Sequence, residues 1–165
     1  MNRRSYLRQA GLAFGILGAG TAVETRDVEF PATYTPLDIL PLAGAKEGVV
    51  NAEGRTAYVA TTGGFAVIDI DDPRDIRIRS HLETILDDHP EGPLKGIWDI
   101  SYDDGHVAVA GPANVRPRGA LAGVAIYDVS VSSDPVLEWF FEAPWPIHNC
   151  DLSRERVLLT AIDGR

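Results

Sequence analysis

The chain has 165 residues, with 24 acidic and 15 basic side chains and a formal net charge of −9 at pH 7. This charge excludes nonspecific nucleic-acid binding, which needs lysine and arginine to displace counterions, and it disfavours adhesion to anionic lipid. The single cysteine, Cys150, excludes a disulfide within the chain. The sequence contains no phosphate-binding glycine loop, nucleophile elbow, zinc-protease motif or Cys-x-x-Cys pair, so no enzyme class follows from a motif.

The N-terminus resembles a twin-arginine export signal. The residues that carry this resemblance are Arg3, Arg4, Tyr6 and Leu7. The apolar stretch over residues 10–23 is shorter than the roughly 20 residues that span a bilayer and suits a signal peptide. We therefore predict a signal peptide over residues 1–22, recognition by export machinery, and an extracellular or cell-surface location. The alternative is a chance arginine pair before an apolar segment.

The rest of the chain divides into a lead-in and a folded region. Residues 23–45 contain three prolines and are predicted to form a linker, with Val28–Phe30 as an alternative outer strand. Residues 46–165 are predicted to fold as the units 46–83 and 96–142 and the partial unit 146–165.

Short apolar runs separated by turn dipeptides predict β-strands and no long helix after the signal. The expected strands are 48–52, 56–61, 64–70 and 76–82 in the first unit, 97–101, 106–110, 124–129 and 136–141 in the second, and 147–152 and 156–161 in the partial unit. The runs at 65–70 and 124–129 are almost continuously apolar, which is typical of strands that are covered on both faces.

The units repeat at a spacing of 50 residues. Trp98–Ser101 aligns with His148–Asp151, and Ala57–Ala60 aligns with Val107–Ala110 at the same spacing. A period near 50 residues suits a four-stranded propeller blade. A β-sandwich also has short, regularly spaced strands, but the equal spacing favours the propeller.

Two strands carry a family resemblance. Ala66–Ile70 reads Ala-Val-Ile-Asp-Ile, and Ala125–Val129 reads Ala-Ile-Tyr-Asp-Val. They resemble the LVIVD repeat, which is named for a Leu-Val-Ile-Val-Asp strand followed by a Ser/Asp-x-Pro turn. The resemblance implies a β-propeller over residues 46–165, and the second copy departs from the pattern in Tyr127 and in its later proline. The family supplies a fold rather than an activity. Abundant aspartate with only two lysines also resembles haloarchaeal proteins, whose acidic surfaces stay hydrated in strong salt.

The predicted fold class is therefore all-β, as an incomplete β-propeller of four-stranded blades that follows a signal segment. It would have two complete blades and part of a third, whereas closed propellers have about four to eight. We expect the chain to be an N-terminal piece of a longer protein or a truncated reading frame. The alternative is closure by oligomerisation, because an open stack leaves strand edges unpaired.

The richest polar cluster is His148-Asn149-Cys150-Asp151. The innermost strand of each propeller blade lines the central channel, so we predict that His148, Asp151 and the aligned Trp98 lie near a channel mouth and bind a ligand. The alternative is a histidine that is hydrogen-bonded to the backbone of the neighbouring blade. One histidine and one aspartate make an incomplete zinc shell, so a metal stays unknown and no cofactor is evident.

The remaining polar residues favour structural roles. Cys150 is predicted to be a small apolar filler, although His148 lies on the same strand face and would permit a Cys/His pair. Asp69 and Asp128 end the two motif strands and are predicted to accept hydrogen bonds from turn N–H groups. The acidic turns at 71–75 and 103–104 lack calcium-loop spacing and are interpreted as solvated turns. His89 and His106 receive no role.

Two functions follow as expectations. The first is an exported, non-enzymatic propeller module that binds a protein or small molecule at the channel mouth or through the loops 84–95 and 111–122. Trp145, between two prolines, is a candidate surface contact, whereas Trp139–Phe141 are predicted to pack between blades. The alternative is the N-terminal part of a propeller enzyme, a metal-dependent hydrolase or oxidoreductase, with a channel site near His148. A third reading is a degenerate fragment without a stable fold.

Overall fold

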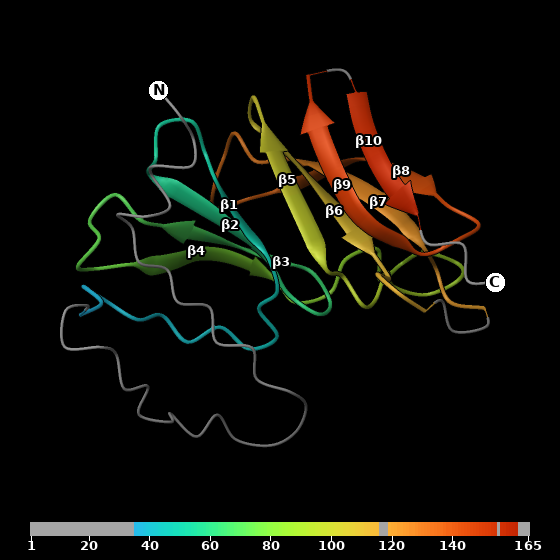
Figure 1. Cartoon of the computed structure of the whole chain (residues 1–165), viewed down its shortest axis with the longest axis horizontal. Coiled ribbons are helices and arrows are strands. Elements are labelled where there is room, and N and C mark those ends of the chain that lie inside the picture. Colours follow the sequence, from blue (N-terminus) through green and yellow to red (C-terminus); the bar gives the residue numbers. More distant parts are fainter. Residues whose placement is uncertain (1–34, 116–118, 155, 162–165) are drawn as a thin grey trace.

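In the computed structural model, which describes residues 35–115, 119–154 and 156–161, the protein consists of β-strands joined by turns and loops (Figure 1). The strands are β1 (Gly48–Val50), β2 (Thr56–Ala60), β3 (Phe65–Asp69), β4 (Arg77–Leu82), β5 (Asp99–Asp103), β6 (His106–Gly111), β7 (Gly123–Asp128), β8 (Val136–Glu142), β9 (Ile147–Ser153) and β10 (Arg156–Ala161). These described ranges contain no helix, and hence none that could cross a membrane. The predicted all-β class is confirmed.

The strands form three antiparallel sheets in which consecutive strands are neighbours. The first sheet has the order β1-β2-β3-β4, the second β5-β6-β7-β8, and the third β10-β9. They lie side by side, and within the described residues they do not close into a ring (Figure 1). The grouping of strands into two four-stranded units and one two-stranded unit therefore follows the prediction.

β1 is shorter than predicted because its turn begins early. The side-chain Oδ1 of Asn51 accepts the backbone N–H groups of Arg55 (2.9 Å) and Thr56 (3.1 Å). An asparagine side chain that bonds the backbone in this way competes with ladder pairing. The strand consequently ends at Val50 rather than at Ala52.

β5 is shifted by two residues relative to the prediction. The N–H of Ile97 donates to the carbonyl of Thr62 (3.2 Å), in a loop of the first sheet, whereas the N–H of Trp98 already donates to the carbonyl of Ala110 in β6 (3.1 Å). The strand therefore begins only at Asp99. At the other end Asp103 still pairs with His106, because a two-residue turn at Asp104 and Gly105, both with positive φ, closes the hairpin.

The first interface, between the first and second sheets, is apolar and aromatic. Its buried residues are Tyr58, Ala60, Phe65, Val67, Ile85, Leu94, Ile97, Ile100, Val107, Val109, Leu121, Ala125, Tyr127 and Val129. Tyr58 stacks on Tyr102 with ring centroids 5.0 Å apart, and Phe65 meets Tyr127 edge-on at 5.1 Å. Each fully buried large side chain contributes about 1.5–3 kcal/mol to folding.

The second interface, between the second and third sheets, is smaller in its side chains. Its buried residues are Ala108, Ala110, Val124, Ala143, Ile147, Cys150 and Leu152. Because side chains alternate along a strand, β6 sends Val107 and Val109 to the first interface and Ala108 and Ala110 to the second. β6 and most of β7 are thus covered on both faces, as the continuous apolar run at 124–129 predicts, whereas the outer part of the sheet at β8 is not.

Part of the predicted linker packs on the outer face of the first sheet. Leu40, Leu42 and Ala45 contact a cluster that contains Val59 and Ile68. The carboxylate of Asp38 accepts the N–H of Ile76 (3.0 Å), which ties the lead-in to the segment before β4. Residues 35–45 therefore cover the sheet rather than extend from it, and the alternative strand at 28–30 lies outside the described residues.

The aspartates that end the two motif strands form the predicted turn contacts. Asp69 Oδ1 accepts the N–H of Asp71 (3.1 Å), and Asp128 Oδ1 accepts the N–H of Ser130 (2.7 Å). These backbone hydrogen bonds, which favour the ionised form, hold the pKa of both carboxyl groups below its ordinary value. The structural interpretation of Asp69 and Asp128 is confirmed.

Candidate functional site

The first strands of the three sheets lie next to one another, and this row is where the predicted ligand site falls. β1 neighbours β5, and β5 neighbours β9 (Figure 1). Glu47 lies opposite Ala60, Asp99 opposite Ala110, and Asn149 opposite Thr160. These partners are 50 residues apart, so Glu47, Asp99 and Asn149 occupy equivalent positions. The fold thus collects polar side chains at one end of the row.

Alternate side chains of β5 accept hydrogen bonds from the backbone of β9. Asp99 Oδ2 accepts the N–H of Cys150. Ser101 Oγ accepts the N–H of Leu152 (2.9 Å). Asp103 Oδ2 accepts the N–H of Arg154 (2.6 Å). An unpaired strand edge is a liability, and these three acceptors satisfy the N–H groups on the edge of β9 that faces away from β10.

Glu47 and Asp99 form a carboxyl pair at the end of this row. Partial loss of solvent around the Glu47 side chain, together with a hydrogen bond to Asp99 and the charge of Asp99, raises the pKa of Glu47 to about 7. The charge of His148 acts in the opposite direction. A neighbouring carboxylate disfavours ionisation, so Glu47 can hold or release a proton near neutral pH.

The predicted ligand residues each contact a different partner. His148 is half-buried, and its Nδ1 lies 2.7 Å from Asn149 Oδ1. Asp151 accepts a long hydrogen bond from Ser101 Oγ (3.3 Å). Trp98 lies under the ammonium group of Lys46, 5.3 Å from the ring centroid. All three belong to the first-strand row, and a shared ligand for them stays a prediction.

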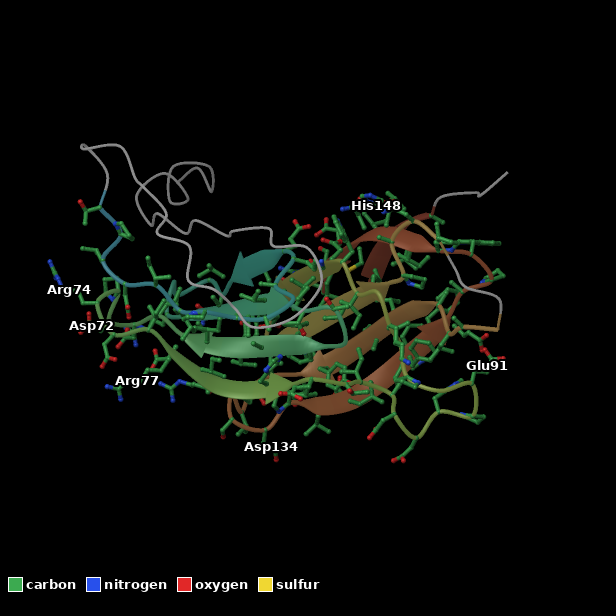
Figure 2. The ribbon with its side chains drawn as sticks, turned by 90° about the horizontal axis from the view of Figure 1, so that it is seen from below. Asp72, Arg74, Arg77, Glu91, Asp134 and His148 are labelled. Atoms are coloured by element: carbon green, nitrogen blue, oxygen red, sulfur yellow. The ribbon has the colours of Figure 1, made fainter. Side chains whose placement is uncertain are left out.

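No group of three or more histidine, cysteine, aspartate or glutamate side chains is arranged to hold a metal in the part of the chain that the structure describes. The acidic turn after β3 projects at the end of the molecule away from His148 (Figure 2). Its charges are partly matched by arginines, with Arg55 Nε 3.4 Å from Asp71 and Arg77 paired with Asp75. This agrees with the interpretation of residues 71–75 as a solvated turn.

Cys150 is buried in the second interface and fills it as an apolar residue. Its thiol contacts the carbonyl oxygen of Ala108 (3.5 Å) rather than the imidazole of His148, which bonds Asn149. Burial, together with the charge of Asp99, raises the pKa of the thiol well above its ordinary value. A buried, protonated thiol is a poor nucleophile, so the filler interpretation is confirmed.

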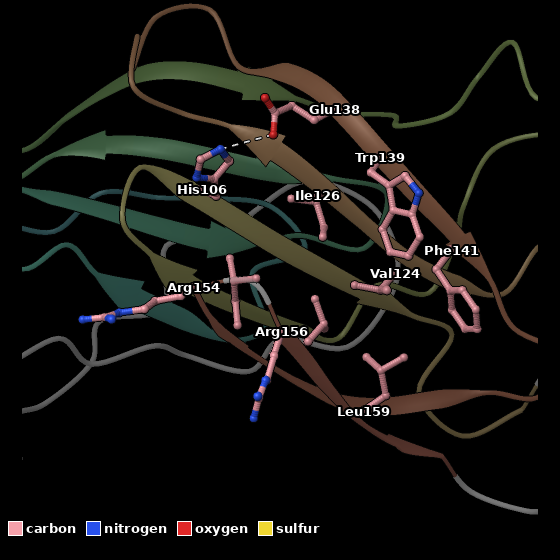
Figure 3. Close-up of a pocket in the computed structure, with 11 residues that line it drawn as sticks. His106, Val124, Ile126, Glu138, Trp139, Phe141, Arg154, Arg156 and Leu159 are labelled. Carbon is pink, nitrogen blue, oxygen red and sulfur yellow. Dashed lines mark ion pairs between the residues drawn. The ribbon is translucent and has the colours of Figure 1, made fainter.

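A second candidate site, which the sequence did not predict, is an apolar groove between the outer part of the second sheet and β10 (Figure 3). Its cavity volume is about 580 Å³. It is lined by His106, Val124, Ile126, Glu138, Trp139, Phe141, Leu152, Arg154, Arg156, Val157 and Leu159. We refer to this surface as the groove.

The groove corrects the prediction that Trp139–Phe141 all pack between sheets. Phe140 is half-buried and packs against the first interface. Trp139 and Phe141 point the other way, stack on each other with centroids 6.0 Å apart, and are 53% and 41% exposed. They stay exposed because the described third sheet has two strands, which cover only the part of the second sheet near β6.

One end of the groove is charged. His106 Nε2 of β6 lies 3.2 Å from Glu138 Oε2 of β8, across the intervening strand β7 (Figure 3). Arg154 and Arg156 extend from the β9–β10 hairpin at the same end (Figure 3). In a chain of net charge −9, this gives the groove two arginines beside an apolar floor. His106, which received no role from the sequence, therefore belongs to this surface.

The predicted partner loops are largely structural. In the loop 84–95, Ile85 pairs with Leu94 in an isolated bridge, and both are buried in the first interface. In the loop 111–122, Leu121 is buried, whereas residues 116–118 lie outside the described residues. Trp145 is 51% exposed, which agrees with its prediction as a surface residue.

No protein-family model matches this chain, and no curated protein matches it. The export-signal residues Arg3, Arg4, Tyr6 and Leu7 lie outside the described residues. The two candidate sites are therefore the groove and the row of first strands.

Proposed function

We propose that the protein is an exported binding module of β-propeller type, built from LVIVD-like repeats and acting at or outside the cell surface. The observation that carries the binding function is the groove, in which Trp139 and Phe141 lie exposed beside Val124 and Leu159. An exposed apolar patch with a polar rim is typical of a surface that binds another polypeptide.

The groove also borders a strand whose outer edge has no described partner. In the part of the chain that the structure describes, β10 pairs with β9 alone. A strand edge offers main-chain hydrogen bonds to an extended peptide, and adjacent apolar surface gives it specificity. The groove is for this reason a better candidate partner surface than the loops 84–95 and 111–122, whose apolar residues are buried.

A selection experiment tests the binding function. Random peptides displayed on phage are selected on the full chain and counter-selected on a Trp139→Ala variant. Trp145→Ala is the matched control, because it removes an equally exposed tryptophan outside the groove. We expect peptides that bind the wild-type chain and the control but not Trp139→Ala. A selection whose binders ignore the Trp139 change would overturn the groove as the binding surface.

Export is tested separately. A reporter fused behind residues 1–45 is expected to leave the cytoplasm of a host with a twin-arginine pathway. Replacing Arg3 and Arg4 by lysine should retain the reporter inside. Export that persists in the double variant, or that requires an unfolded reporter, would contradict the proposed route.

The Glu47–Asp99 pair favours a second candidate function, a propeller enzyme with a channel site near His148. A carboxyl group with a pKa of about 7 is suited to proton transfer at neutral pH. If His148 binds a metal, His148→Ala should abolish metal uptake and leave the fold intact. Unchanged metal content in that variant would remove this candidate.

A further inference from the structure

The two faces of the sheets that meet at the interfaces use equivalent positions. Phe65 pairs with Ala60 in the first sheet, and Val124 pairs with Ala110, 50 residues after Ala60, in the second. The neighbouring strand continues the equivalence, because Phe65 pairs with Leu82 and Val124 with Phe141. The first interface therefore shows which kind of strand packs on such a face.

At the first interface the third strand of the next sheet is the cover. Tyr127 of β7 meets Phe65 edge-on, and Ala125 lies in the same cluster. Phe65 and Val67 are fully buried there, and Leu82 is half-buried. At the second interface Ile126, the equivalent of Val67, is only half-buried, and Phe141, the equivalent of Leu82, is exposed. The groove thus occupies the place that β7 fills one interface earlier.

The edge of β10 that has no partner among the described strands is oriented to receive such a strand. In the first sheet the N–H of Ala60 donates to the backbone carbonyl of Glu47, on the side of β1 (2.8 Å). The next N–H along the strand, that of Thr61, donates to the carbonyl of Gly64, on the side of β3 (2.8 Å). Alternate N–H groups point to opposite sides of an antiparallel strand. By the 50-residue spacing, the N–H groups of Val157 and Leu159 face the open side of β10.

The charged end of the groove indicates the sequence of the occupant. Thr56 pairs with Asp69, and His106 pairs with Asp128, at the ends of the two motif strands. The equivalent position in β10 is Arg156, 50 residues after His106. A strand that ends in aspartate would bring its carboxylate opposite this guanidinium group, where opposite charges across strands are favourable.

From these observations we propose that the groove binds an extended polypeptide strand of the β3 and β7 type, with apolar residues followed by aspartate. The strand adds antiparallel to β10 and sets its aspartate against Arg156. This inference rests on the proposed binding function and names its ligand class. A second copy of the chain fits less well, since β10 reads Arg-Val-Leu-Leu-Thr-Ala and brings no carboxylate to Arg156.

The test uses a fluorescent peptide with the sequence of residues 122–130 and the full chain. Fluorescence anisotropy should show saturable binding, weakened at least about tenfold by Trp139→Ala, because the apolar floor supplies most of the contact. Trp145→Ala should leave the affinity unchanged. Hydrogen exchange at the Val157 and Leu159 amides should slow on binding, as expected for strand addition.

A charge exchange tests the predicted register. Arg156→Glu should weaken the peptide about fivefold, the scale of a partly exposed ion pair, and a peptide with lysine in place of Asp128 should recover the loss on that variant only. Unchanged thermal unfolding shows that the variants fold. Equal binding of both peptides to both chains would overturn the aspartate assignment.

The outcomes separate this inference from the proposed function. Groove-dependent peptides from the phage selection that are not extended, or that lack the aspartate, would overturn the strand and leave the binding module standing. Failure of both the selection and the repeat-type peptide would overturn both. A concentration-dependent dimer that protects Val157 and Leu159 and excludes the peptide would overturn the proposed occupant in favour of a second copy.

Discussion

The two interfaces of this molecule join equivalent strands by different physical means. At the first interface, Val49 of β1 packs against the apolar cluster, and Tyr58 stacks on Tyr102. At the second, the residue equivalent to Val49 is Ser101, which accepts the N–H of Leu152. The same repeat therefore holds its neighbour by apolar burial in one place and by side chain-to-backbone hydrogen bonds in the other.

The residue just before the first hairpin turn also has a different partner in each four-stranded sheet. Asn51 directs its side chain to its own turn, at Arg55 and Thr56. The equivalent Asp103 directs its carboxylate to the N–H of Arg154 in the next sheet. One residue stabilises a turn and the other stabilises an interface, so equivalent positions in a repeat need not contribute equivalent contacts.

The largest expected effect comes from the first interface. Phe65→Ala should lower the free energy of unfolding by about 3–5 kcal/mol, because it leaves a cavity in a fully buried cluster. Urea denaturation measures the change. Phe141→Ala deletes the same side chain at an exposed position in the groove and should cost less than about 1 kcal/mol. Equal costs would contradict the assignment of the main core to the first interface.

The hydrogen bonds of the second interface predict a smaller effect. Ser101→Ala leaves the N–H of Leu152 without its acceptor and should cost about 1–3 kcal/mol. The matched control is Ser101→Thr, which keeps the hydroxyl oxygen. Hydrogen exchange at the Leu152 amide should accelerate in the alanine variant more than at amides of β2. If exchange at Leu152 stays as slow as in the wild type, the hydroxyl does not hold the edge of β9.

Much of this fold could be predicted from the sequence because the strands are bounded by strong local signals. Apolar runs between Gly, Pro and Asp turns located all ten strands, and the 50-residue spacing grouped them into sheets. The predicted end of β1 and the predicted start of β5 were wrong. These boundaries depend on contacts of Asn51 and Ile97 with residues outside the apolar run. Local patterns contain no information about such contacts.

The candidate sites were less predictable, for a physical reason. Glu47 and Asp99 meet only because β1 and β5 lie side by side, and neither residue belongs to a motif. The exposure of Trp139 depends on how many strands cover it, which the pattern of β8 cannot reveal. The one available signal was the equivalence of Arg156 with Thr56 and His106, both of which lie opposite an aspartate.

The carboxyl pair of Glu47 and Asp99 predicts that the free energy of unfolding changes with pH by about 1 kcal/mol. Ionised Glu47 is disfavoured in the folded state, because its pKa rises from 4.5 to about 7. Its contribution is thus most favourable below pH 4.5 and is lost as the pH rises from 4.5 through 7. This change in unfolding free energy is smaller than the full pKa shift would give, because the Glu47 side chain is exposed and its charge is screened by solvent.

Glu47→Gln isolates this contribution. The variant should lose the dependence, so that the difference in unfolding free energy between variant and wild type grows in favour of the variant from pH 5 to pH 8. Urea denaturation at both values gives the measurement. A difference that stays constant across this range would show that folding does not raise the pKa of Glu47.

The smallest expected effect on stability compares the two sheets at a single position. Trp139 pairs with Ile126 as Ser80 pairs with Val67, so Trp139→Ser gives the second sheet the residue of the first. Since Trp139 is 53% exposed, the change should shift the free energy of unfolding by only about 0.5 kcal/mol. The same variant should lose most of its affinity for groove ligands. A large stability loss in thermal unfolding would mean that Trp139 belongs to the core of the second interface, and the groove would then be a packing surface rather than a binding one.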